Sequence, residues 1–103
     1  MAERRVYSLQ LRAIQWRNDI FRRNNWTCQK YNERGIKLNA HHIIPFSELI
    51  KKYNIKTILQ AINCSELWNL DNGITFSEKA HKEFHRRYGI KNNTLEQVLE
   101  FMR

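Results

Sequence analysis

All four histidines of the chain lie in two short stretches, and imidazole is well suited both to bind a transition metal and to transfer a proton near pH 7. The first stretch holds the adjacent pair His41 and His42, and the second holds His81 and His85. Residues four apart on a helix share one face, so His81 and His85 can bind one metal ion together. A third ligand from the first pair would complete a site with three protein ligands and an open position, as in catalytic metal centres.

The first histidine pair is expected on a strand. Pro45 cannot donate a hydrogen bond to a β-ladder, and the residue before a proline avoids the helical region. We therefore interpret Leu38 to Ile44 as a strand that ends there. Neighbouring side chains on a strand point to opposite faces, so one histidine can hold a metal ion while the other faces an attacking water molecule.

The second pair is expected on a helix that follows a turn and a brief strand. Asp71-Asn72-Gly73 is a strong turn signal, and residues 74–76 alternate as a short strand. The helix begins with either Thr75 or Ser77 as its N-cap, and Gly89 is a typical C-terminal stop. The histidine stripe of this helix would then face the ends of the strands, and its apolar stripe would face the core.

Further helices are predicted around these elements, because apolar residues recur at helical spacing. They cover residues 8–23, 48–53, 55–63 and 95–102, the last capped by Thr94. The first eight residues are polar and basic and are expected to form a loose arm. The three tryptophans are interpreted as core anchors rather than base-stacking platforms; they are Trp16, Trp26 and Trp68.

The predicted strands and helices together indicate a fold of the α+β class. The length of 103 residues predicts a single domain, residues 1–103. Within it we expect a basic helical N-terminal arm (1–25), a core (26–88) with a helical insertion (46–66), and a C-terminal helix (89–103). No repeat or Gly/Ser-rich linker indicates a second domain.

The composition is strongly basic, with 18 Lys and Arg residues against 10 Asp and Glu residues and a net charge of +8. This charge is typical of a nucleic-acid binder, although membrane surfaces also attract it. No apolar run is long enough to span a bilayer and no signal-peptide pattern is present, so we expect a cytoplasmic protein. The two cysteines, Cys28 and Cys64, are then expected to be reduced thiols.

The histidine stretches and their spacing resemble the HNH nuclease motif. The residues that carry the resemblance are His41-His42-Ile43-Ile44-Pro45, then Asn72, His81 nine residues later, and His85. The resemblance implies a ββα-metal finger, a short antiparallel hairpin and a helix around one ion, here flanked by additional helices. It covers roughly residues 26–88, and phage-encoded and intron-associated members are similar in general appearance.

The resemblance also implies a role for each motif residue. His41 matches the first metal ligand and His42 the general base. Asn72 matches the middle asparagine, which orients the base in some members and contacts the ion in others. His81 matches the final motif histidine, and His85 an additional ligand of the histidine-rich members.

The sequence departs from many relatives, which carry two CxxC pairs around a structural zinc. Only Cys28 remains here, with Tyr31, Ser77 and Ala80 at the other three positions. We therefore expect a fold held by apolar contacts, without a second metal.

The chemistry implied by the resemblance is DNA hydrolysis with one divalent ion as cofactor. His42 would take a proton from water, while the ion would act as a Lewis acid on the phosphate. The expected ion is Zn, Ni, Mn, Co or Mg, with imidazole ligands favouring the transition metals.

DNA is the expected partner. Basic residues on or near the histidine helix predict a phosphate-binding rim, and the alternative for them is a solvated helix face; they are Lys79, Lys82, Arg86, Arg87 and Lys91. One active site per chain is compatible with nicking or with a homodimer that cuts both strands. A phage packaging or intron context would place the protein in the host cytoplasm.

Two other functions are compatible with the same residues. The first is a noncatalytic, zinc-stabilised DNA-binding module with Cys28, Cys64, His81 and His85 as ligands, although the close cysteine pair of such modules is missing. The second is an RNA-directed or toxin-type nuclease that uses the same site on another substrate.

Overall fold

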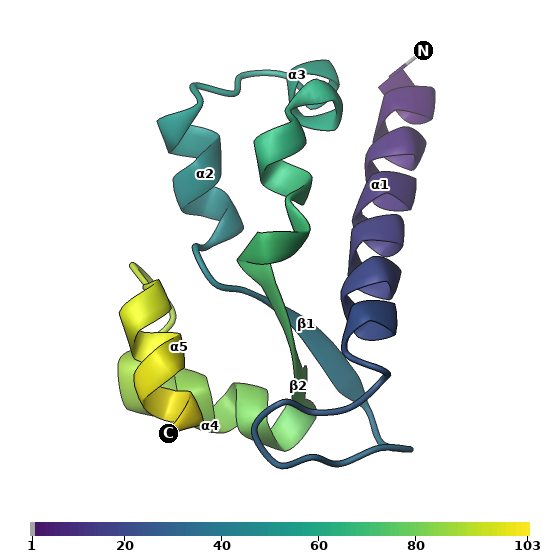
Figure 1. The fold of residues 1–103 in the computed structure, drawn as a ribbon. Coiled ribbons are helices and arrows are strands. Elements are labelled where there is room, and N and C mark those ends of the chain that lie inside the picture. The colour runs from purple at the N-terminus through teal and green to yellow at the C-terminus, as the bar shows by residue number, and fades with distance from the viewer. Residues whose placement is uncertain (1) are drawn as a thin grey trace.

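The computed structural model describes residues 2–103, in which five α-helices surround a two-stranded sheet (Figure 1). In chain order the elements are α1 (Ala2–Arg23), β1 (Leu38–His42), α2 (Phe46–Lys52), α3 (Ile58–Asn63), the 3₁₀ helices η1 (Ser65–Trp68) and η2 (Leu70–Asn72), β2 (Gly73–Ser77), α4 (Glu78–Tyr88) and α5 (Leu95–Met102). The fold is therefore of the α+β class, as predicted, with a ββα unit and flanking helices. No helix within these residues has the length and apolar character needed to span a membrane.

The two strands form an antiparallel pair in which His41 lies opposite Ile74 and His42 opposite Gly73. β1 ends at His42, two residues before the predicted end. One further backbone bond follows in the same register, from the N–H of Ile43 to the carbonyl oxygen of Asn72 at 2.9 Å, but Asn72 already belongs to the 3₁₀ helix η2. The hairpin thus closes with a loop contact directly after the histidine pair.

β2 leads into α4 without an intervening loop. The Oγ atom of Ser77, the last residue of β2, accepts a hydrogen bond from the N–H of Ala80 at 3.1 Å, so Ser77 is the N-cap. Thr75 is buried inside β2, where its hydroxyl donates to Asn24 Oδ1 at 2.9 Å. At the other end Gly89, at φ = +81°, terminates the helix as predicted.

Three predicted helix starts were wrong. α1 begins at Ala2, so the first residues are not a loose arm; Ala, Glu and Arg are strong helix formers that extend it. α2 begins at Phe46, because Pro45 is its N-cap and the Pro45 carbonyl oxygen accepts the first helical hydrogen bond, from the N–H of Leu49 at 3.2 Å. α3 begins only at Ile58, because Thr57 forms a capping box there.

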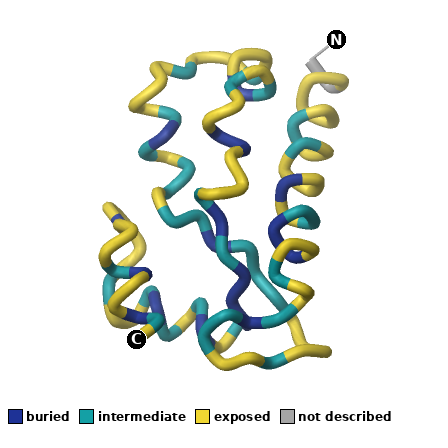
Figure 2. Tube along the Cα trace, viewed as in Figure 1, coloured by how far each residue is buried: buried dark blue, intermediate teal, exposed yellow. Residues whose placement is uncertain are grey.

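The insertion and the C-terminal region form separate clusters on the two sides of the hairpin. The first cluster joins α1 to the insertion and contains Trp16, Ile20, Leu49, Ala61, Leu67 and Trp68. The second lies between β2, α4 and α5 and contains Cys28, Phe76, Ala80, Phe84, Val98 and Phe101. Figure 2 shows the buried residues along the hairpin and the C-terminal half of α1, whereas the turn between α2 and α3 is mostly exposed.

Of the three predicted core tryptophans, two are buried. Trp16 and Trp68 belong to the first cluster. The prediction for Trp26 was wrong, because 43% of this residue is exposed. It follows the end of α1 in a tight turn with φ = +53°, and it packs on Phe21 with one face only.

Gly73 allows α1 to approach the start of β2 closely. A Cβ atom at this position would lie 2.4 Å from Ile20 Cδ1 and 2.7 Å from Trp16 Cζ2. Both distances are shorter than van der Waals contact. The absence of a side chain at Gly73 therefore sets the distance between α1 and the strand pair that carries His42.

We expect Gly73→Ala to lower the free energy of unfolding by about 1–3 kcal/mol, because it overpacks this contact. Ile20→Val removes the nearest atom, Cδ1, so the same glycine substitution should cost less in an Ile20→Val background. Urea denaturation of the four proteins of this double-mutant cycle measures the difference. An equal cost in both backgrounds would contradict the contact.

Candidate metal centre and active site

Three histidines from two elements converge on one point. His41 lies on β1, and His81 and His85 lie one turn apart on α4. One ring nitrogen from each comes together in a group whose members all lie within 4.8 Å of one another. The spacing of four along α4 and the direct passage from β2 to α4 produce this arrangement.

His41 is buried in an apolar environment. Its ring lies 4.6 Å from the Phe84 ring and 5.4 Å from the Phe76 ring, centroid to centroid. Its Nε2 atom is buried and has no hydrogen-bond partner among the described residues. Burial, and then the proximity of His81, His85 and His42, lowers the pKa of His41 to about 3, so the ring is neutral and can bind a metal ion at physiological pH.

His81 and His85 present their Nε2 atoms to each other at 3.1 Å. The Nδ1 atom of His85 lies 2.9 Å from the carbonyl oxygen of Gly89. A backbone carbonyl only accepts hydrogen bonds, so Nδ1 of His85 carries the proton and Nε2 carries the lone pair. Burial, and then His85, lowers the pKa of His81.

These residues fit a divalent metal ion. An unpaired buried imidazole nitrogen is costly, and a metal bond would satisfy Nε2 of His41. Neutral imidazoles are the protonation state that metal binding requires. In a tetrahedral site with bonds of about 2.0–2.1 Å, two ligand nitrogens are separated by roughly 3.3 Å, close to the 3.1 Å between His81 and His85.

His42 lies on the other face of β1, against α1. Its ring stacks on Trp16, with centroids 4.1 Å apart and an interplanar angle of 13°, and the edge of Phe46 lies beside it. Its Nε2 atom is buried without a partner in the described part of the chain. Burial lowers the pKa of His42 to about 4, so this imidazole is also neutral at physiological pH.

A cavity of about 270 Å³ connects the histidine cluster with His42. Its lining consists of Ala40, His41, His42, Pro45, Phe46, His81, His85, Ile90 and Asn93. Two adjacent histidines therefore border one cavity although they pack against different elements. The cavity offers space for a phosphate group between the cluster and His42.

Asn72 binds the loop that follows β1. Its Oδ1 atom accepts from the N–H of Ile44 at 2.8 Å, and its Nδ2 atom donates to the carbonyl oxygen of Ile44 at 3.0 Å. Both of these side-chain hydrogen bonds of Asn72 thus go to the backbone two residues after His42, and neither goes to the His42 ring. Asn72 fixes the path of the chain directly after the histidine pair.

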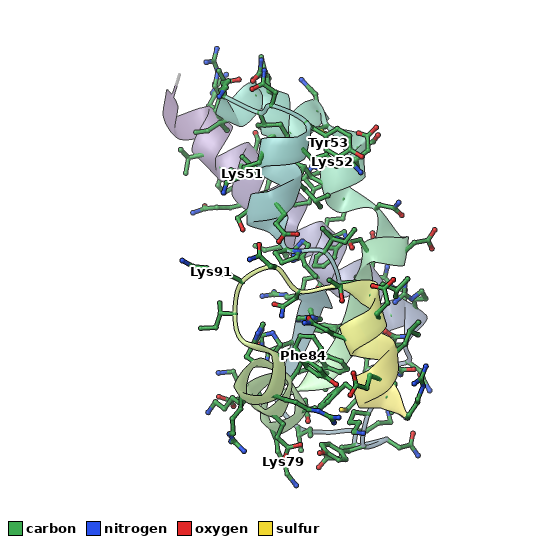
Figure 3. The ribbon with its side chains drawn as sticks, turned by 90° about the vertical axis from the view of Figure 1, so that its left-hand side faces the viewer. Lys51, Lys52, Tyr53, Lys79, Phe84 and Lys91 are labelled. Atoms are coloured by element: carbon green, nitrogen blue, oxygen red, sulfur yellow. The ribbon has the colours of Figure 1, made fainter. Side chains whose placement is uncertain are left out.

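The four basic residues of α4 lie outside the cavity of the histidines. Lys82 pairs with Glu78 at 3.3 Å, and Arg87 pairs with Glu100 at 2.9 Å. Lys79, Lys82 and Arg86 share a surface hollow with two glutamates. Figure 3 shows Lys79 below α4 and Lys91 on the loop above it. Their contact with DNA stays a prediction.

The structure contradicts the zinc module with two cysteine ligands. Cys28 is buried in the second cluster beside Ala80 and Phe84, whereas Cys64 packs against the first cluster and donates to Glu66. No candidate metal group in residues 2–103 includes either cysteine. The two thiols are separated because they belong to opposite sides of the hairpin.

Two supporting residues were not predicted from the sequence to contact the site. Trp16 was interpreted only as a core anchor, and it also forms the surface on which His42 stacks. The helical spacing of apolar residues places Trp16 on the apolar face of α1, but it does not indicate that His42 is the stacking partner. Asn93 is 2% exposed and lines the cavity, and no local pattern marks it.

The comparisons with known proteins agree with this geometry. A family model described as HNH endonuclease matches residues 20–89, which include both strands, α4 and all four histidines. No curated protein and no solved structure matches the chain. Since the family model covers more than half of the 103 residues, the chain belongs to the HNH endonuclease family.

Proposed function

We propose that this protein is a metal-dependent endonuclease that hydrolyses DNA phosphodiester bonds. The observation that carries the proposal is the convergence of three imidazole nitrogens within 4.8 Å beside a fourth, separately packed histidine. In this proposal His41, His81 and His85 bind one divalent ion, and His42 is the general base. Asn72 positions the loop behind His42.

His42 is neutral at physiological pH and its orientation is fixed, so it can accept a proton, but the lowered pKa makes it a weaker base than a free imidazole. Stacking on Trp16 restricts rotation of the ring, and the hydrogen bonds of Asn72 hold the loop that follows. His42 takes a proton from water as the water oxygen attacks phosphorus and the bond to the leaving oxygen breaks. A bound divalent ion supplies Lewis-acid polarisation of the phosphate and stabilises charge on the leaving oxygen.

The donor set also bears on the metal and the substrate. Three imidazoles favour Zn, Ni or Co over Mg, with Mn as an intermediate case. A net charge of +8 supports a polyanionic substrate, and DNA binding by such a protein weakens steeply with salt. We propose DNA rather than RNA, and competition between duplex DNA and RNA in the cleavage assay discriminates the two.

His42→Ala should fold and still bind metal and DNA, but lose cleavage by about two orders of magnitude or more, the usual contribution of a general base. Nicking of supercoiled plasmid across a panel of Zn, Ni, Co, Mn and Mg measures the loss. Asn63→Ala, at an exposed and uncharged site in the insertion and outside the histidine cavity, is the control and should cleave normally. Undiminished nicking by His42→Ala would remove His42 from the mechanism.

His81→Ala should weaken metal binding as well as abolish cleavage, because it removes one of the three converging nitrogens. Calorimetric titration of the metal-free protein with Zn²⁺ measures the affinity directly. His42→Ala provides the matched comparison, since it lies beside the cluster and should retain the affinity. Equal Zn²⁺ affinity in His81→Ala and the wild type would contradict the assignment of this ligand.

A further inference from the structure

Asn93 is a buried polar residue in the loop between α4 and α5. It is 2% exposed, and it lines the same cavity as the four histidines. A buried amide is retained at little cost only when its hydrogen bonds are satisfied. The partners of Asn93 therefore indicate what the residue holds in place.

The side-chain amide of Asn93 donates two hydrogen bonds. Nδ2 donates to the carbonyl oxygen of Gly89 at 3.2 Å and to Oε1 of Gln97 at 3.2 Å. The Gly89 oxygen can only accept, so the amide nitrogen, and not its oxygen, faces it. The same Gly89 oxygen lies 2.9 Å from Nδ1 of His85. A continuous chain of hydrogen bonds thus leads from α5 to a proposed metal ligand.

Asn93 joins the end of α4 to the first turn of α5. Gly89 lies just past α4 at φ = +81°, in a conformation that glycine adopts readily, and its carbonyl belongs to no regular element. Gln97, in contrast, is fixed by the capping box of α5, in which its Oε1 accepts from the N–H of Thr94 at 3.1 Å. Asn93 therefore connects the carbonyl group just past α4 to a side chain that is fixed on α5.

We propose that Asn93 is a positioning residue of the metal centre. By holding the Gly89 carbonyl, it keeps the proton of His85 on Nδ1 and directs the Nε2 lone pair toward Nε2 of His81, 3.1 Å away. Partners of this kind orient histidine ligands, and their loss typically weakens metal affinity about 10- to 100-fold. This inference rests on the proposed function of the histidine cluster, and it adds a residue outside the motif.

The test compares wild type with Asn93→Leu, which has a similar shape and no hydrogen-bond donor. Two quantities are measured: Zn²⁺ affinity by calorimetry, and the tautomer of His85 in the metal-free protein from the ¹⁵N chemical shifts of its ring. In wild type we expect the Nδ1–H tautomer. In Asn93→Leu we expect about 10- to 100-fold weaker Zn²⁺ binding and a mixture of both neutral tautomers.

The control is Val98→Ala, which shortens a buried apolar side chain of α5 and removes no hydrogen bond of the chain from Gln97 to His85. It should destabilise α5 and leave both readouts unchanged, so it separates positioning from general stability. Folded Asn93→Leu with wild-type affinity and tautomer would overturn the inference. A wild-type His85 protonated on Nε2 would also overturn it, even if the variant fails to fold. Absence of Zn²⁺ binding by wild type would contradict the proposed metal site. The hydrogen-bond chain would still be supported if wild-type His85 is the Nδ1–H tautomer and the tautomer changes in Asn93→Leu.

Discussion

The candidate site depends on one constraint, the rigid passage from β2 into α4. Ser77 is both the last residue of the strand and the N-cap of the helix, so the direction of α4 is set by the hairpin itself. The antiparallel register pairs His41 with Ile74, three residues before Ser77, and so fixes the position of His41 relative to the start of α4. The three imidazoles meet because α4, which carries His81 and His85, follows β2 without a loop. β2 in turn pairs with β1, the strand that carries His41.

The alternation of side chains along β1 gives adjacent histidines different surroundings. His41 packs against Phe76 and Phe84, on the side of α4, whereas His42 stacks on Trp16 of α1. Each ring is held by a different apolar cluster. Residues of one chemical type, joined by a single peptide bond, can therefore serve as metal ligand and proton acceptor without competing for the same position.

Much of the site was predictable, because the signals that define it are local. The spacing of His81 and His85, the N-cap Ser77 and the stop at Gly89 each follow from a few neighbouring residues. The start of α1 was missed, because the strong helix propensity of its polar first turn was underestimated.

The partners of Asn72 and Asn93 could not be predicted, because they depend on how distant segments meet. Asn72 contacts the backbone 28 residues before it, at Ile44. The cluster that buries Trp16 likewise joins α1 to the insertion. Long-range contacts of this kind leave no periodic pattern in a single sequence.

The turn between α2 and α3 has a practical consequence for labelling. Its residues Tyr53, Asn54 and Lys56 are exposed, and of the helices on either side α3 packs mainly on α1 and α2 mainly on η1. Extra residues at this turn would lengthen a surface connection at small entropic cost. A fluorophore or affinity handle can therefore be attached there without displacing the imidazoles.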